Sequence, residues 1–193
     1  MKLNHTGDTN TDLVSVIRER RTIRDFNGQP LEREVLLDIL ENAVWAPFHG
    51  RREPWRFILF TAGGRARFAD AVMDTYSPEL ADKWSRWARK QYCELIQAHL
   101  LVVIEADPRQ KYWEDAFSAA SALIQNIQLL AWEKHVGTVW KTNEWNLDPA
   151  FYMKAGIQSH ERIVGTLHLG YFDKTPKPKA RTPVKDLLTE FTE

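Results

Sequence analysis

The sequence predicts a single α+β domain that ends in an extended C-terminal arm. Apolar residues recur at helical spacing in several segments, and short β-branched runs lie between these segments. A basic stretch with several prolines follows the last of the runs. The 193 residues contain no internal repeat and no clear domain boundary, and the length suits one domain with a substantial core.

Helices are expected wherever apolar residues line one face. The expected segments, the first of them with Asp12 as a plausible N-cap, are 13–17, 31–44, 65–74, 79–97, 112–134 and 149–155. Segment 112–134 is the longest, and small residues cluster in its first half, so we expect it to be buried in the domain or in a dimer interface. Segment 79–97 carries a narrow apolar seam, which is typical of a helix that packs on a subunit or covers a ligand, and equally of a plain surface helix. The seam consists of Leu80, Trp84, Trp87, Gln91 and Leu95.

Strands are expected over 54–60, 99–106, 136–143 and 162–171. The run 99–106 is almost continuously apolar and β-branched, as is typical of a central strand buried on both faces. Gly165 and Gly170 interrupt the last strand, and such glycines often mark close approach of another backbone or of a ligand.

The two ends of the chain have different compositions. Residues 1–10 are polar, and we expect a poorly ordered leader there, with the domain covering 11–193. Residues 172–193 form the predicted arm, which is basic and contains prolines before a short amphipathic end at Val184, Leu187 and Leu188. Because such an arm makes no core of its own, we expect it to dock on another surface.

The composition argues against several classes of protein. Lys+Arg and Asp+Glu number 26 each, so no overall field attracts nucleic acid or membranes. Cys93 is the only cysteine, which excludes an internal disulfide and favours a cytoplasmic setting. The N-terminal residues resemble no secretory signal, and no apolar run approaches the roughly 18 residues that span a bilayer.

Common catalytic motifs are also missing. The six histidines are scattered without metal-ligand spacing, so no metal site is expected. The sequence has no Gly-x-Ser-x-Gly elbow, no Gly-x-Gly-x-x-Gly turn and no phosphate-binding loop that ends in Lys-Ser/Thr. By elimination, any chemistry is expected to belong to a bound cofactor.

One basic cluster suits a phosphate group. Arg20, Arg21 and Arg24 surround the hydroxyl of Thr22 where the first helical pattern ends. Guanidinium groups bind phosphate oxygens bidentately and keep their charge, although a basic triplet is often only a solvated face.

Five blocks of sequence, in order, resemble the FMN-dependent nitroreductase family, in particular its compact single-domain members. The blocks are Ile17–Phe26, Ala43–Phe57, Ser121–Trp140, Ile163–Gly170 and Lys179–Pro183. Together they extend the resemblance from about Leu13 to Leu188. The resemblance implies an α-β-α sandwich with a mostly antiparallel sheet, FMN at a homodimer interface, and a C-terminal arm exchanged between subunits.

The resemblance also implies roles for single residues. It assigns the FMN phosphate and ribityl end to Arg20, Arg21 and Thr22, and the return of the arm to the phosphate to Lys179 and Arg181. It places Arg24 on the pyrimidine side of the ring, and Phe48 and His49 at positions that reach the flavin from the partner subunit. It places Trp140, Lys141 and Thr142 along the ring edge near N5. No residue is assigned as catalytic, because the chemistry would take place on the flavin.

Physical chemistry is consistent with these roles. Each charge-assisted hydrogen bond to the phosphate would contribute roughly 1.5–3 kcal/mol. Arg24 near N1 and C2=O would stabilise the anionic reduced flavin, and a backbone N–H near Thr142 or Asn143 would reach N5. Three positions depart from the family pattern: Arg51, Glu53 and Asn143. A carboxylate at Glu53 would disfavour the reduced anion unless an arginine such as Arg51 or Arg52 pairs with it.

The resemblance therefore implies an FMN-dependent NAD(P)H oxidoreductase that acts by a ping-pong reaction on nitroaromatics, quinones or similar acceptors. The alternative is a flavin-binding sensor or scaffold without turnover. A nucleic-acid-binding protein that uses the basic arm is the weakest of the three hypotheses, since no aromatic residues interleave with the arm's charges. The physiological acceptor and the choice between NADH and NADPH stay open.

Overall fold

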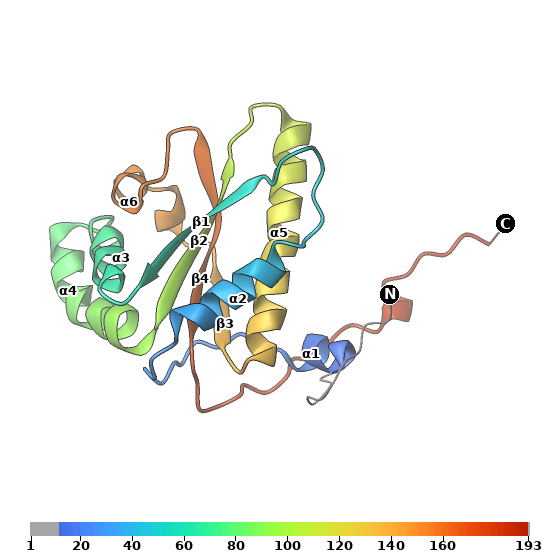
Figure 1. Cartoon of the computed structure of the whole chain (residues 1–193), viewed down its shortest axis with the longest axis horizontal. Helices are drawn as coiled ribbons and strands as arrows, with labels where there is room; N and C mark the ends of the chain where they lie inside the picture. The colour runs from blue at the N-terminus through green and yellow to red at the C-terminus, as the bar shows by residue number, and fades with distance from the viewer. Residues whose placement is uncertain (1–11, 193) are drawn as a thin grey trace.

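The computed structural model describes residues 12–192 and consists of a central sheet with helices on both faces (Figure 1). The leader predicted for residues 1–10 lies outside the described residues. The predicted α-β-α sandwich is confirmed, whereas exchange of the arm between subunits is not tested by one chain.

The sheet has four antiparallel strands in the order β1-β2-β4-β3. Their bounds are Trp55–Thr61 for β1, Ala98–Glu105 for β2, Gly137–Lys141 for β3 and Glu161–Gly170 for β4. The prediction of a central strand is confirmed, because β2 is buried along all but its last residue. A register shift between Val102 and Val103 interrupts the pairing of β2 with β4.

One face of the sheet is covered by α2 (Arg33–Ala43) and α5 (Gln110–Glu133). Leu100, Val102 and Ile104 point from β2 into this layer and pack with the buried stripe of α5. Both helices form where the sequence predicted them, within two residues at each end.

The opposite face is covered by α3 (Gly64–Met73), α4 (Pro78–Arg89) and α6 (Pro149–Ala155). The single helix predicted for 79–97 is wrong at its end, because α4 is followed by a π-helical segment, Lys90–Leu95. There the N–H of Ile96 donates to the carbonyl of Gln91 over 2.9 Å, a five-residue spacing that defines a π turn. The wider turn places Tyr92 in the core.

Helix α1 (Leu13–Glu19) forms as predicted, but its apolar stripe is not part of the core of this chain. Leu13, Val14 and Ile17 are 50–64% exposed, whereas Val16 is buried. The chain then extends along the edge strand β3, where Thr22 forms a parallel bridge with Thr138.

The arm leaves β4 in an extended conformation and passes beside α1 (Figure 1). Its predicted amphipathic end forms one 3-10 turn, Val184–Asp186, and the apolar side chains Val184, Leu187 and Leu188 are exposed. Within residues 12–192 no helix is long and apolar enough to cross a membrane.

Candidate functional site

A basic cavity of about 420 Å³ lies where the arm passes the segment that follows α1. We call it the basic cradle, and its lining residues are Ile17, Arg18, Arg20, Arg21, Thr22, Arg24, Pro176, Lys177, Pro178, Lys179 and Arg181. No acidic side chain is among them. The fold thus brings together residues from the two ends of the chain that the sequence assigned to one phosphate site.

Packing on the edge strand β3 holds the first half of the cradle. Ile23 is fully buried, and its N–H donates to the carbonyl of Thr138 over 2.9 Å. A Cβ at Gly137 would lie 2.9 Å from the side chain of Ile23 and 2.8 Å from the ring of Phe172. Gly137 therefore makes room both for the arginine segment and for the residue from which the arm starts.

The guanidinium group of Arg20 is placed to bind an anion. Its Nη1 is buried and has no hydrogen-bond partner among residues 12–192. Burial lowers the pKa of Arg20 first, and the charges of Arg21 and Arg181 lower it further. A buried cationic donor without an acceptor is costly, so an anion bound here would stabilise the site.

Arg21 is partly used by the protein itself. Its Nη1 donates to the carbonyls of Arg18 over 2.7 Å and Arg20 over 3.0 Å at the end of α1. Its Nε is buried without a partner in the part of the chain that the structure describes. Arg21 thus closes the helix and has only part of its donor set left for a ligand.

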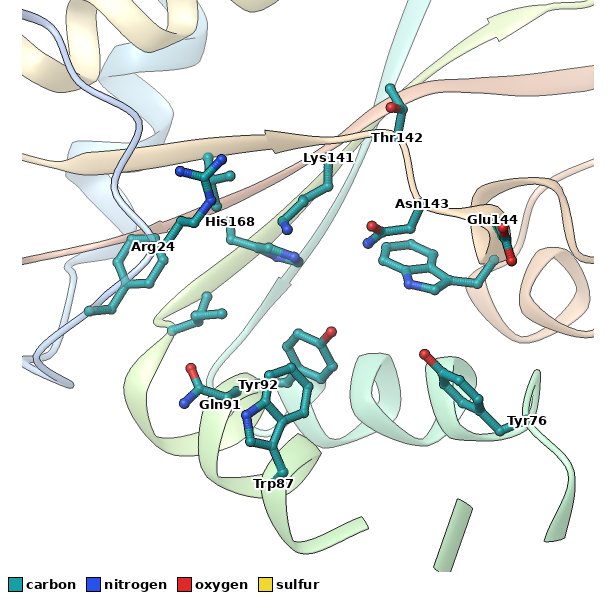
Figure 2. Close-up of a pocket in the computed structure, with 14 residues that line it drawn as sticks. Arg24, Tyr76, Trp87, Gln91, Tyr92, Lys141, Thr142, Asn143, Glu144 and His168 are labelled. Atoms are coloured by element: carbon teal, nitrogen blue, oxygen red, sulfur yellow. The ribbon is translucent and has the colours of Figure 1, made fainter. Parts of the chain in front are cut away.

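A second cavity, of about 660 Å³, lies between the sheet and α4 (Figure 2). We call it the sheet-side cavity, and its lining residues are Arg24, Phe26, Tyr76, Trp87, Gln91, Tyr92, Ile96, Val139, Lys141, Thr142, Asn143, Glu144, Trp145 and His168. Arg24 lines this cavity and the basic cradle alike. One ligand with an anionic end and an aromatic end therefore suits the two cavities together.

Lys141 and Thr142 line the sheet-side cavity where β3 ends, and their place along the ring edge near N5 stays a prediction. Asn143 lies beside them with φ −70° and ψ 160°, so this position is extended and requires no left-handed backbone. Figure 2 shows Arg24, Lys141 and His168 on one side of the cavity and Trp87, Gln91 and Tyr92 on the other.

Trp140 lies on the opposite face of the sheet from this cavity. Its side chain packs with the layer of α2 and α5, and a Cβ at Gly165 would collide with its indole ring. The close approach expected at Gly165 is therefore that of the Trp140 indole. Its Nε1 is buried and has no partner within residues 12–192.

Phe48 and His49 line neither cavity of this chain. Phe48 packs edge-on against Trp55 with 5.6 Å between ring centroids, and His49 is exposed. Their predicted reach into a partner subunit stays a prediction. Glu53 forms no ion pair with Arg51 or Arg52 among the described residues.

Several residues of the sheet-side cavity were not predicted as site residues. Trp87 and Gln91 belong to the seam of segment 79–97, and their position favours the ligand-covering interpretation of that seam. Tyr92 and His168 carried no sequence signal, because each needs the fold to bring it to the cavity. No cluster of residues that could hold a metal ion occurs within residues 12–192.

Comparisons with known proteins agree with this fold. A model described as the Nitroreductase family matches residues 17–171. YfhC of Bacillus subtilis, named as an NAD(P)H nitroreductase, is 38% identical over 182 residues, which cover 92% of this chain and 93% of that protein. The chloronitrobenzene nitroreductase of Comamonas testosteroni is 35% identical, with 95% of this chain and 97% of that protein covered.

Solved structures extend the comparison. The crystal structure of a nitroreductase-like family protein from Bacillus cereus has a TM-score of 0.91 at 38% identity, and the match covers 96% of this chain and 99% of that one. A nitroreductase from Desulfovibrio desulfuricans in complex with FMN has a TM-score of 0.73 at 21% identity, with 95% and 99% covered. The second likeness concerns the fold alone.

Proposed function

The chain belongs to the nitroreductase family, and on this premise we propose that it is an FMN-dependent NAD(P)H oxidoreductase that reduces nitroaromatics, quinones or similar acceptors. The observation that carries the proposal is that Arg24 lines both cavities. It joins the basic cradle, whose lining contains no carboxylate, to the sheet-side cavity with its aromatic side chains. FMN has the matching shape, with a phosphate at one end and a planar ring at the other.

The donor set of the cradle fits a phosphate group. Arg20 offers a buried Nη1 that has no partner among residues 12–192, and Lys179 and Arg181 add charge from the arm. Pro176 and Pro178 restrict the backbone conformation of the arm beside these side chains. The arm would thus close over the phosphate with little loss of conformational entropy.

Residues of the sheet-side cavity would hold and tune the ring. Bound FMN would supply hydride acceptance and electron transfer, as the chemistry of flavins provides. Arg24 would place positive charge beside the pyrimidine and stabilise the reduced anion. Lys141 and Thr142 would border the ring, and Trp87 on α4 would restrict access of water and of acceptors. The chain would position nicotinamide and acceptor in turn on one exposed ring face, as a ping-pong reaction requires.

A homodimer is part of the proposal. Large apolar side chains stay exposed on α1, on the arm and on the loop after α2, including Trp45 at 86% and Phe191 at 90%. Burial of such surface against a second copy would be favourable, and Phe48 and His49 follow Trp45 by three and four residues in sequence. The same dimer would allow these two residues to reach the flavin of the partner.

Purified protein should carry flavin absorbance or acquire it when FMN is added. Anaerobic NADH or NADPH should then bleach the bound flavin, and a nitroaromatic or a quinone should restore the colour. Bound FMN that neither nicotinamide bleaches would favour the sensor or scaffold without turnover. Protein that takes up no FMN would contradict both functions.

A further inference from the structure

Two buried histidines lie side by side beneath the sheet-side cavity. His99 on β2 pairs with His168 on β4 in the register of the sheet, and their Nδ1 atoms are 2.8 Å apart. Phe68 stacks on His99 with 3.9 Å between centroids, and Tyr92 packs on both rings. His168 also lines the cavity, whereas His99 lies behind it.

The hydrogen bonds of the pair determine where its protons lie. His99 Nε2 is 2.8 Å from the carbonyl of Tyr92, which accepts only, so His99 carries its proton on Nε2. In a neutral ring, Nδ1 of His99 is then an acceptor. The short Nδ1–Nδ1 contact therefore requires a proton on Nδ1 of His168, which leaves Nε2 of His168 as a bare acceptor.

The environment of both rings favours their neutral form. Burial lowers the pKa of His99 to about 3, although the bond to the Tyr92 carbonyl opposes this shift. Burial also lowers the pKa of His168, and the neighbouring His99 and then the charge of Lys141 act in the same direction. No carboxylate forms an ion pair with either ring among residues 12–192.

The bare acceptor faces the ligand space. Nε2 of His168 has no hydrogen-bond partner in the described part of the chain. This atom is not fully buried, so a ligand in the cavity can reach it. Figure 2 shows the ring directed into the cavity below Lys141. The arrangement offers an acceptor near two cationic donors, Arg24 and Lys141.

We propose that His168 binds the ligand ring by accepting a hydrogen bond from a ring N–H, and that His99 is a positioning residue that holds His168 in the accepting tautomer. The proposal rests on FMN being the ligand. Oxidised flavin has one ring N–H, at N3, between two carbonyl oxygens. An acceptor near Arg24 and Lys141 matches this acceptor-donor-acceptor edge.

The first test needs no ligand. Nitrogen-15 NMR of the histidine-labelled apoprotein at neutral pH should show His168 protonated at Nδ1 alone and His99 at Nε2 alone. His160 is exposed, and His160→Gln removes one reference signal for assignment. A proton on Nε2 of His168, or a charged ring, would overturn the proposed tautomers.

The second test compares FMN with 3-methyl-FMN, which lacks the N3–H. The wild-type protein should prefer FMN, and His168→Phe should reduce that preference by about tenfold, whereas His160→Gln should leave it unchanged. His168→Gln retains an acceptor and should restore part of the preference. Circular dichroism and unfolding curves of each variant establish that the fold is retained.

The outcomes separate the inference from the proposed function. If FMN binds and the preference is the same in wild type, His168→Phe and His168→Gln, the inference is overturned while the proposed function stands. If the wild-type protein binds no FMN, the proposed function fails and the flavin part of the inference fails with it. The tautomers measured in the apoprotein do not depend on either result.

Discussion

The side chain of Ile23 packs directly on the backbone of Gly137, where a Cβ would approach it to 2.9 Å. This contact fixes the arginine segment on the edge strand β3, next to the hydrogen bond between Ile23 and Thr138. Phe172, from which the arm begins, touches the same glycine. Both halves of the basic cradle are thus anchored at one point of the sheet.

Gly137→Ala should therefore loosen the cradle as well as the fold. The added methyl group forces Ile23 and Phe172 to move, and overpacking of this kind costs about 1–3 kcal/mol. Thermal unfolding should show the loss of stability, and FMN affinity should fall in protein that is still folded. Gly63→Ala is the matched control, because nothing lies within 4 Å of a Cβ there. Equal stability of both variants would contradict the anchoring role of Gly137.

Arg24→Ala should chiefly lower the midpoint potential of the bound flavin, with only a small effect on the affinity for FMN. Loss of a positive charge beside the pyrimidine removes stabilisation of the reduced anion. A tenfold loss corresponds to about 30 mV for a two-electron couple. Anaerobic titration against a reference dye measures the change, with Arg86→Ala on the exposed side of α4 as control. An unchanged potential would exclude Arg24 from contact with the ring.

The buried histidine pair should make stability depend on pH below neutrality. In the unfolded chain a histidine takes up a proton below about pH 6.5, whereas folded His99 resists protonation down to about pH 3. The unfolded state therefore binds more protons across this window, and the free energy of unfolding falls as the pH falls, by up to about 1.4 kcal/mol per unit for each histidine.

Denaturant unfolding at several pH values measures this slope. The double variant His99→Leu with His168→Leu should lose the histidine part of it. The carboxylates, among them Glu161 with its pKa lowered by the hydrogen bond from Arg56, should contribute equally to both proteins. Parallel pH profiles of the two proteins would show that the pair is not buried in the neutral form.

The sequence predicted the elements well, because most of them have strong local signals. Helix α6 is an example, since Pro149 begins it, Asp148 accepts a hydrogen bond from Ala150, and Gly156 ends it at φ 76°. The π-helical segment after α4 was missed because helical periodicity alone does not show a single wider turn. Helix α1 was correctly predicted to be amphipathic. Periodicity does not show, however, which protein surface covers its apolar face.

The residues of the candidate site also differ in whether the sequence alone could predict them. Five lining residues of the cradle were predicted as phosphate or ribityl contacts, because block order and charge mark them in the sequence: Arg20, Arg21, Thr22, Lys179 and Arg181. His99 and His168 were not, because strands 69 residues apart in sequence must pair before the two rings meet. Trp140 shows the converse, since a one-residue step along β3 places its side chain on the other face of the sheet from Val139 and Lys141.

The most direct test of the account compares FMN with riboflavin, which lacks the phosphate. If the cradle holds the phosphate, Arg20→Ala should weaken FMN binding by about tenfold to a hundredfold and leave riboflavin binding within about twofold. Arg86→Ala should affect neither ligand. Equal losses for FMN and riboflavin in Arg20→Ala, or no loss for FMN, would contradict the assignment of the cradle.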